Sequence, residues 1–376
     1  MAELLKHRYS RRYLQQVARA VAARSPRFDA AAFTRGVLAD GWDDLELKQR
    51  MHRIAAALQA HLPGSYRQQL AVLRRAAPEF GGFEAMFFPD FVEQFGQHDW
   101  QASMEALEHF TRFSSSEFAV RPFIAQQPGR TLARMLDWAG HHDEHLRRLA
   151  SEGSRPRLPW AMRLPQLIAD PAPLLPILER LRADPSGMVR RSVANNLNDI
   201  AKDHPAFVLD LARRWRGERP ATDALLKHAC RTLLKNGDAG ALRLFGHDHE
   251  AQARVSDLRL AAARLPIGGT LGFGFAVTLA QKEAAKLRIE YAVDFVKASG
   301  STSRKVFKVG ERSFQPGERA RIERRHRFTD FSTRKHYLGA HRIAIVVNGV
   351  ERAARTVRLL ASRQAPETAA SPLRTH

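Results

Sequence analysis

The spacing of apolar residues changes near residue 250 from a helical period to a strand period. Before this point, short segments carry apolar residues three and four positions apart, with Pro and Gly between them. After it, apolar residues alternate with charged ones over 287–295, large apolar residues recur at every second position at Ile343, Ile345 and Val347, and Asn348-Gly349 follows as a hairpin signal. We therefore predict a multidomain protein, α then β.

The first part reads as pairs of short helices, with one pair for roughly every 35 to 45 residues. Among the helices that the pattern predicts are 115–125 and 221–235. Asp184-Pro185-Ser186 and His204-Pro205 are helix-boundary signals within it. Such pairs are typical of HEAT-like repeats, which stack into an α-solenoid with a concave face suited to a long ligand. The prediction for residues 1–250 is a HEAT-like repeat α-solenoid.

The second part consists of short strands separated by turns over residues 255–361. This pattern suits an immunoglobulin-like β-sandwich, although the cysteine pair of many such domains is absent. Residues 362–376 are predicted to form a flexible tail. The single cysteine, Cys230, excludes disulfides within the chain and zinc sites with several cysteines, and it fits a reducing compartment.

The N-terminal residues lack the apolar run of a signal peptide, and no stretch approaches the roughly 20 apolar residues of a membrane span. We expect a cytoplasmic protein that does not bind membranes. The net charge is +21, and more than half of this excess lies in 255–361. Such a charge favours a polyanionic partner, most often nucleic acid.

Basic clusters in the β domain are better placed than isolated charges to contact a phosphate backbone, because they stand close to turns and beside aromatic residues. The predicted contacts are Arg304, Lys305, Arg334 and Lys335. The alternative is a solvated basic surface without a ligand.

The stretch 189–205 combines an apolar stripe with a row of short polar residues. The stripe is Val189, Val193, Leu197 and Ile200, and the row opposite is Ser192, Asn195, Asn196, Asp199 and Lys202. Asn and Asp weaken a helix because they compete for backbone hydrogen bonds, so this row indicates a function. The alternative is a ladder of asparagines that satisfies backbone groups of a neighbouring helix.

Two further stretches could carry chemistry. The loop 151–160 presents Glu152, Arg155, Arg157 and Trp160 and is stiffened by two prolines. Alternatively, Trp160 packs between repeats and Glu152 pairs with Arg155. In 113–123, Glu117 follows three serines, and Ser114 with Glu117 has the spacing of a capping box at the start of a helix.

The motifs SSSEFAVRPF, LASEGSRPRLPW and VRRSVANNLNDIAKDHP occur in this order and resemble those of the bacterial DNA alkylation repair glycosylases of the AlkC type, relatives of AlkD. The β domain is similar to the immunoglobulin-like domain of one AlkC branch. The resemblance implies a monofunctional DNA glycosylase, with residues 1–250 as its catalytic domain. It would excise 3-methyladenine and 3-methylcytosine by hydrolysis of the N-glycosidic bond, without capturing the base in a closed pocket.

The same resemblance implies a catalytic site of Glu117, Glu152, Trp160 and Asp199. Departure of a cationic base builds positive charge on the deoxyribose, which fixed carboxylates stabilise. We expect Asp199 to position the water, Glu117 and Glu152 to stabilise the sugar cation, and Trp160 to attract the cationic nucleotide through its ring face. The residues expected to hold the flanking phosphates are Arg155, Arg157, Arg190, Arg191 and Lys202.

We expect no cofactor and no metal, a double-stranded DNA partner with alkylated bases, and a monomer. Two alternatives stay open at this point. One is a HEAT-repeat scaffold that binds nucleic acid by charge without catalysis, and the other is a protein-interaction adaptor whose β domain docks a partner.

Overall fold

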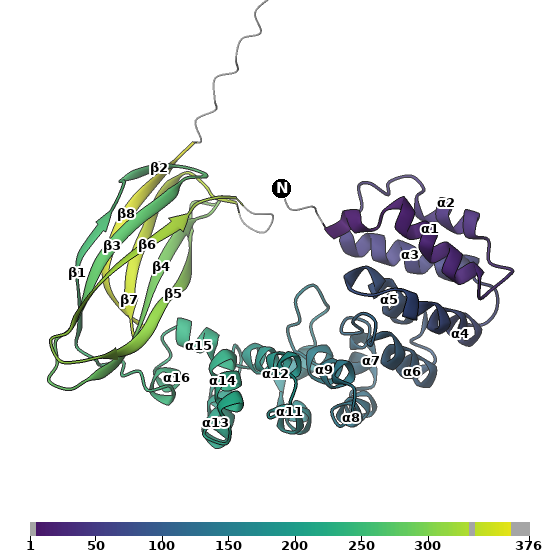
Figure 1. The fold of residues 1–376 in the computed structure, drawn as a ribbon, viewed down its shortest axis with the longest axis horizontal. Helices are drawn as coiled ribbons and strands as arrows, with labels where there is room; N and C mark the ends of the chain where they lie inside the picture. The colour runs from purple at the N-terminus through teal and green to yellow at the C-terminus, as the bar shows by residue number, and fades with distance from the viewer. Residues whose placement is uncertain (1–4, 331–334, 362–376) are drawn as a thin grey trace, which may run out of the picture. The chain divides into compact units, whose positions relative to one another are not determined.

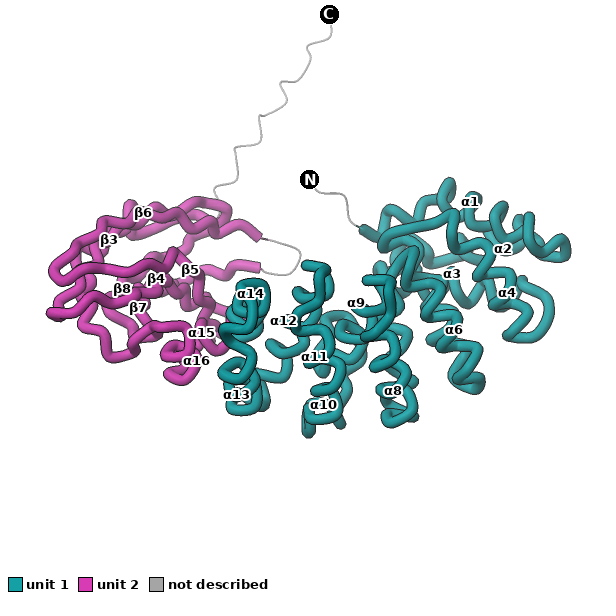
Figure 2. The backbone as a smooth tube through the Cα atoms, turned by 60° about the horizontal axis from the view of Figure 1, so that its bottom comes forward, with its two compact units in different colours: residues 1–230 teal, residues 231–376 magenta. Residues whose placement is uncertain are grey.

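The computed structural model describes residues 5–330 and 335–361. The chain divides into two compact units, residues 1–230 and residues 231–376, which we call the helical unit and the β unit (Figure 2). Two short helices that lie within the predicted first domain, α15 (Arg231–Lys235) and α16 (Ala239–Leu244), belong to the β unit.

The described part of the helical unit contains fourteen α-helices and four short 3-10 turns. The helices are α1 (Arg11–Ala22), α2 (Ala30–Val37), α3 (Leu47–His61), α4 (Tyr66–Ala76), α5 (Phe87–Phe95), α6 (Trp100–Phe110), α7 (Arg121–Gln126), α8 (Pro128–Trp138), α9 (Glu144–Gly153), α10 (Pro165–Ala169), α11 (Leu175–Leu181), α12 (Gly187–Ile200), α13 (Pro205–Trp215) and α14 (Pro220–Ala229). The 3-10 turns are η1 (Leu5–Arg8), η2 (Ala77–Glu79), η3 (Phe83–Met86) and η4 (Ala172–Leu174).

Successive helices of this unit form two layers, as the HEAT-like prediction requires. In Figure 1, α8, α11 and α13 lie in one layer, and α9, α12 and α14 lie in the other. Helix α12 packs between α9 and α14. Its predicted stripe is confirmed, because Val189, Val193 and Leu197 have no exposed surface and Ile200 is buried as well.

Local signals in the sequence explain where several helices begin. Pro128, Pro205 and Pro220 each occupy the first position of a helix, where the missing N–H has no helical partner to lose. A capping box joins Ser65 and Gln68 at the start of α4. Helix α2 was not among the helices expected from the sequence, although Asp29 caps it by accepting a hydrogen bond from the Ala32 N–H.

Two predicted helices are wrong in detail. The helix expected from Ser115 does not form there, because residues 115–120 make turns and α7 starts only at Arg121. The single helix expected over 221–235 is divided at Cys230, whose backbone angles, φ −82° and ψ 7°, leave the helical region.

The strands of the β unit form two sheets. They are β1 (Ala253–Leu260), β2 (Arg264–Pro266), β3 (Thr270–Leu279), β4 (Ala285–Val296), β5 (Thr302–Phe314), β6 (Arg319–Arg327), β7 (Gly339–Val347) and β8 (Val350–Leu360). One sheet has the order β1-β3-β6 and the other β2-β8-β7-β4-β5. Neighbouring strands are antiparallel except β2 and β8, which are parallel.

A continuous apolar core fills the space between the two sheets, which confirms the predicted sandwich. Alternate residues of β3, such as Phe273 and Phe275, meet alternate residues of β4, such as Ile289 and Tyr291. The predicted hairpin is also present: Asn348 and Gly349 both have positive φ, at 49° and 79°, as a two-residue turn of this type requires.

The short helices of the β unit are fixed to this hairpin. A Cβ atom on Gly349 would lie 2.7 Å from the Gly237 Cα atom, so the close approach of the two backbones requires glycine. The buried Asn348 side chain accepts a hydrogen bond from the Arg288 N–H at 2.7 Å and donates one to the Asp248 carbonyl at 2.6 Å. The segment after α16 is therefore anchored to the turn between β7 and β8.

Candidate active site

Arg155 joins two of the predicted carboxylates in the interior of the helical unit. Its Nη1 atom donates to Glu152 Oε1 at 2.5 Å, and its Nε atom donates to Asp199 Oδ2 at 2.8 Å. Glu152 lies at the end of α9 and Asp199 in the last turn of α12, so the packing of these two helices brings the carboxylates together. Asp199 also accepts a hydrogen bond from Lys202 Nζ at 2.8 Å.

This group of charges is desolvated. Glu152, Arg155 and Asp199 expose 6%, 7% and 1% of their surfaces. Burial alone lowers the pKa of Arg155, but the hydrogen bond to Asp199 and the charges of both carboxylates raise it, and the net shift is upward. Arg155 therefore remains a cation that holds two anions at fixed positions.

A second buried arginine, Arg121, holds the loop between α9 and α10. It donates to the carbonyls of Gly153, Arg155 and Met162, each at 2.8 Å. Burial, and next the charge of Arg155, lower the pKa of Arg121 to about 10, so this side chain is still charged at neutral pH.

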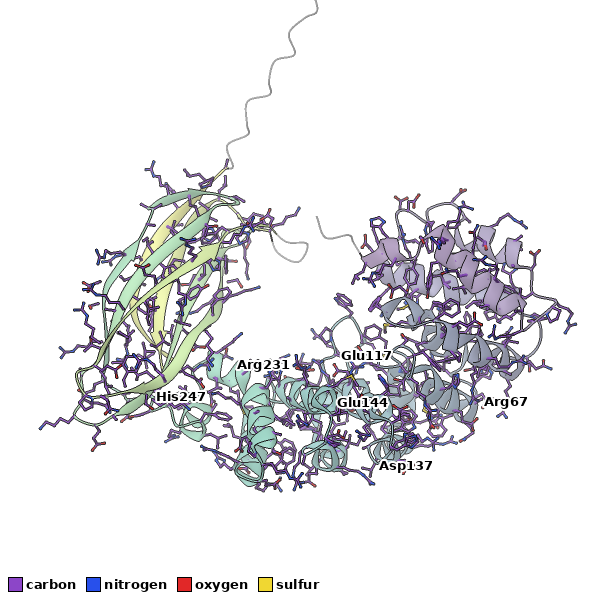
Figure 3. All side chains as sticks on the ribbon, in the orientation of Figure 1. Arg67, Glu117, Asp137, Glu144, Arg231 and His247 are labelled. Carbon is purple, nitrogen blue, oxygen red and sulfur yellow. The ribbon has the colours of Figure 1, made fainter. Side chains whose placement is uncertain are left out.

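Glu117 lies on the segment that leads into α7 (Figure 3). The charges of Glu117 and Asp199 both raise the pKa of Arg121, which places the two carboxylates within electrostatic range of one buried guanidinium. Glu117 Oε2 accepts hydrogen bonds from Ser115 Oγ at 2.8 Å and from Arg148 Nη2 at 2.7 Å. Its side chain keeps 15% of its surface exposed.

The predicted capping box between Ser114 and Glu117 is wrong. Ser114 Oγ donates to the Gly82 carbonyl, and Ser116 Oγ donates to the Leu107 carbonyl. Because serine hydroxyls bond so readily to nearby backbone, they stabilise turns here in place of a helical start.

Trp160 has the most unusual backbone of the candidate residues. Its φ angle is +64°, a region that bulky side chains rarely adopt, and its side chain is exposed, with 64% of the residue surface accessible. Lys48 Nζ of α3 donates a hydrogen bond to the Trp160 carbonyl at 2.9 Å. The Phe83 ring packs edge to face against the indole, with 6.3 Å between the ring centroids. Such strain, held by surrounding contacts around an exposed ring, is characteristic of functional positions.

The polar row of α12 is not solvated, because most of it is buried between helices. Asn196 Nδ2 donates to the Ser151 carbonyl of α9 at 2.8 Å, and Asn198 Nδ2 donates to the Ala229 carbonyl of α14 at 2.7 Å. Ser192 and Ser151 share a hydrogen bond at 2.6 Å. Asn196 therefore makes the backbone contact of the predicted alternative, a ladder between stacked helices. Asn198, which was not in the predicted row, makes a similar contact, whereas Asn195 bonds to the His228 ring and Asp199 pairs with cations.

The predicted phosphate-binding residues of the helical unit differ in their surroundings. Arg157 forms a two-pronged ion pair with Asp203, with both distances 2.8 Å, and this pairing lowers the pKa of Asp203. Arg190 donates to the carbonyls of Asp184 and Pro185, whereas Arg191 is exposed.

The predicted contacts of the β unit lie in two segments, 304–305 and 334–335. Arg304 of β5 pairs with Asp294 and Glu351. Lys305 and Lys335 are exposed, and Arg334 lies outside the described residues.

Three basic residues with no role expected from the sequence hold the candidate site. Lys48 bonds to Trp160, Arg121 to the loop between α9 and α10, and Arg148 to Glu117. Arg121 and Arg148 lie within or next to the quoted motifs, so their position was a usable signal. Lys48 lies 112 residues before Trp160, and nothing in its own neighbourhood marks it.

Two kinds of feature are not found among the described residues. Within residues 5–330 and 335–361, no group of three or more His, Cys, Asp or Glu side chains could hold a metal ion. In the same residues, no helix has the length and apolarity needed to cross a membrane.

Comparison with known proteins gives three matches. Residues 254–361 match a family model described as "Uncharacterised protein YhaZ, C-terminal Ig-like domain". The uncharacterised protein YhaZ of Bacillus subtilis is 45% identical over 345 residues, which cover 92% of this chain and 96% of that protein. The solved structure of the Pseudomonas fluorescens alkylpurine DNA glycosylase AlkC, bound to DNA with an abasic site analogue, is 40% identical with a TM-score of 0.91, and the match covers 96% of this chain and all of that one.

Proposed function

This chain belongs to the AlkC family, and we propose that it is a DNA glycosylase that removes alkylated bases from double-stranded DNA as a monomer. At a finer level, we propose 3-methyladenine and 3-methylcytosine as substrates, because both bases are cationic and good leaving groups. The observation that carries the proposal is the fixed pair of carboxylates, Glu152 and Asp199, on either side of Arg155.

The reaction needs negative charge beside the deoxyribose. The cationic base takes the electron pair of the glycosidic bond and leaves neutral, while the sugar becomes an oxocarbenium ion. Water then adds to C1′ and loses a proton. Carboxylates that are already oriented stabilise this cation without reorganising, which is the largest contribution that a site of this kind can make.

We assign different roles to the three carboxylates from their surroundings. Asp199 is the most buried and lies in a regular helix, which suits a group that orients water and accepts its proton. Glu117 and Glu152 would face the sugar cation. Arg155 is enclosed by carboxylates, so its placement suits the positioning of Glu152 and Asp199 more than contact with a phosphate.

Through Lys202, the binding of DNA could free an oxygen of Asp199 for the nucleophilic water. Its side chain is 41% exposed and its Nζ atom binds Asp199 Oδ1. A phosphate next to the lesion would compete for this exposed lysine and free one oxygen of Asp199 for water, while Arg155 keeps the carboxylate in place.

Trp160 would meet the damaged nucleotide from outside the protein surface. An exposed indole on a stiff loop can attract a cationic base through its ring face. Because this ring projects from a loop and is not enclosed, the base need not enter a closed pocket.

The test is single-turnover release of 3-methyladenine from methylated duplex DNA. Asp199→Asn and Glu152→Gln keep the shape of each side chain and remove its charge, so excision is expected to fall at least about a hundredfold. Affinity for DNA with an abasic analogue should change only a few fold. Asp210→Asn is a matched control, because Asp210 is an exposed carboxylate on α13.

Unchanged excision in both site variants would reject the assignment. A scaffold that binds DNA by charge alone would release no base in any variant. An adaptor for a protein partner would show DNA binding that varies little with salt, whereas a protein that neutralises several phosphates binds less tightly as salt rises.

A further inference from the structure

The outward face of the β1-β3-β6 sheet carries arginines that have no acidic partner. Register places Arg259 of β1 opposite Gly274, and Arg321 and Arg325 of β6 opposite Ala276 and Gly272. Paired residues share a face of the sheet, and Phe273 and Phe275 of β3 point into the core, so all of these residues face outward. We call this surface the arginine trough; its walls are Arg259, Arg321 and Arg325, and its floor is Gly272, Gly274 and Ala276.

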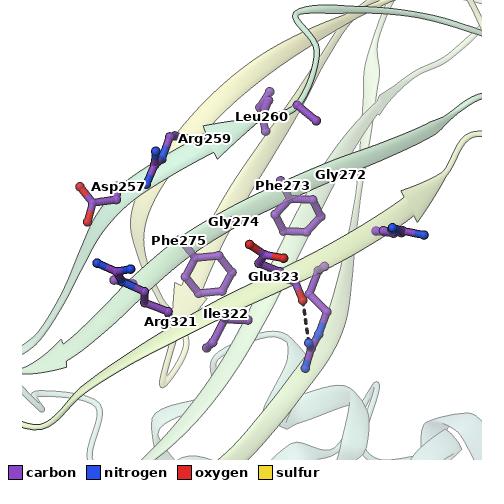
Figure 4. A pocket seen from close by; sticks show the side chains of 14 residues that line it. Asp257, Arg259, Leu260, Gly272, Phe273, Gly274, Phe275, Arg321, Ile322 and Glu323 are labelled. Atoms are coloured by element: carbon purple, nitrogen blue, oxygen red, sulfur yellow. Dashed lines mark hydrogen bonds between the residues drawn. The ribbon is translucent and has the colours of Figure 1, made fainter.

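The trough is a real depression. The sheet face is hollowed over about 850 Å³, and all six residues line the hollow. Figure 4 shows Arg259 and Arg321 on opposite sides of the strand that carries Gly274. Arg319 and Asp257, an ion pair, stand beside it.

The fold itself does not explain the two glycines of the floor. Neither glycine has a positive φ angle. A Cβ atom added to Gly272 would lie 3.4 Å from its nearest neighbour and one added to Gly274 would lie 3.6 Å away, which are ordinary contact distances. Glycine inside a strand lowers stability by roughly 0.5–1 kcal/mol relative to alanine. Glycine in a strand interior often marks a place where a ligand approaches the backbone closely.

Some arginines of the opposite sheet are paired with acidic side chains, whereas others, such as Arg355 and Arg358 of β8, form no ion pair with the described residues. Arg342 of β7 pairs with Asp294 and Glu351, and Arg312 of β5 pairs with Glu318. Among the described residues, Arg259, Arg321 and Arg325 form no ion pair and all three are exposed. Two acidic side chains are present among the residues that line the hollow: Glu323, which lies opposite Gly274 in the register, and Asp257, which pairs with Arg319.

The shape and charge of the trough suit an extended polyanion. Arg321 and Arg325 are four residues apart on one strand, which separates them by roughly 13–14 Å, more than one phosphate ion can span. Arginine matches phosphate oxygens with a planar fork of donors. The aromatic rings of the lining are buried, so the trough lacks the exposed apolar anchors that protein partners usually need.

We propose that the arginine trough binds the phosphate backbone of DNA away from the damaged nucleotide. This contact is independent of the lesion and of base excision, and it adds a second surface to the proposed catalytic site. It would keep the protein on undamaged DNA between lesions.

The experiment measures binding of the full-length protein to undamaged duplex DNA at several salt concentrations. Arg321→Gln/Arg325→Gln is expected to weaken binding about tenfold and to reduce the slope of log K against log salt by roughly 2, because about 0.9 ion is released for each phosphate contact. The matched control is Arg312→Gln/Arg342→Gln, which removes the same charge from paired arginines and should retain the slope.

A second variant separates shape from charge. Gly274→Val fills the floor and favours the strand conformation, so the melting temperature is expected to be equal or higher while binding to undamaged duplex weakens. Release of 3-methyladenine at saturating DNA should be unchanged in both trough variants, which distinguishes loss of this contact from failure of the proposed glycosylase.

Three results would overturn the proposal. The first is an unchanged salt slope in Arg321→Gln/Arg325→Gln. The second is an equal loss in the paired-arginine control, which would show a general charge effect. The third is binding of poly-glutamate that depends on the trough arginines while DNA affinity does not, which would indicate an acidic protein segment.

Discussion

Arginines of the candidate active site differ from those of the arginine trough in burial and in pairing, although all carry the same charge. Arg155 is buried between two carboxylates, whereas Arg321 and Arg325 are exposed and unpaired. A buried cation held by two carboxylates has a fixed geometry, which suits the reacting site that we propose. An exposed cation without a partner is available to any polyanion. Under our two proposals, the buried arginine serves catalysis and the exposed arginines serve DNA binding.

The largest effect is expected from breaking the buried group. Arg155→Met leaves Glu152 and Asp199 buried without their shared partner, and removal of one partner of a buried ion pair destabilises a protein by about 3–5 kcal/mol. Urea unfolding of the variant and of the native chain would measure this difference. A change below about 1 kcal/mol would show that Arg155 contributes no more than a surface charge.

The next effect concerns the whole β unit. We expect a chain ending at Cys230 to keep its helical circular dichroism and to bind duplex DNA on the order of a hundredfold more weakly, since the unit's phosphate contacts are lost. Full DNA affinity in the shortened protein would contradict the assignment of grip to the β unit.

A smaller effect is expected from the contact that holds Trp160. Lys48→Met removes the donor to the Trp160 carbonyl, and loss of one such bond, about 1–1.5 kcal/mol, corresponds to roughly a tenfold slower single-turnover excision. Lys48→Arg keeps a donor and should restore part of the rate. If Lys48→Met excises bases at the native rate, Lys48 has no positioning role.

The smallest effect is expected at a paired arginine of the helical surface. Arg157→Gln breaks the exposed ion pair with Asp203, and such pairs contribute about 0.2–1 kcal/mol. Thermal unfolding should shift by no more than a few degrees. A larger loss of stability than in Arg155→Met would remove the distinction between buried and exposed pairing.

Periodicity and turn chemistry predicted much of the fold because both are local. The stripe of α12 and the hairpin at Asn348-Gly349 depend on residues a few positions apart, and both are confirmed. The turns before α7 were missed because the hydroxyl of Ser114 bonds to a carbonyl 32 residues away, which no local pattern contains.

The residues of the candidate site could be predicted from the sequence, but the hydrogen bond that joins Arg155 to Asp199 could not. Glu152, Arg155 and Asp199 were all singled out, and the sequence suggested the pair Glu152–Arg155, which are three residues apart. The bond from Arg155 to Asp199 spans 44 residues and depends on the packing of α9 against α12. The positive φ angle of Trp160 could not be foreseen, since tryptophan rarely adopts it.

Because Trp160 is exposed, the intrinsic tryptophan fluorescence of the protein can report on this residue. Of the five tryptophans, Trp42, Trp138 and Trp215 are buried and Trp100 is half-buried. Most of the emission that acrylamide can quench will therefore arise from Trp160, the indole that we propose contacts the damaged nucleotide. Titration of the unlabelled protein with modified oligonucleotides will then reveal, through fluorescence alone, when that ring leaves water.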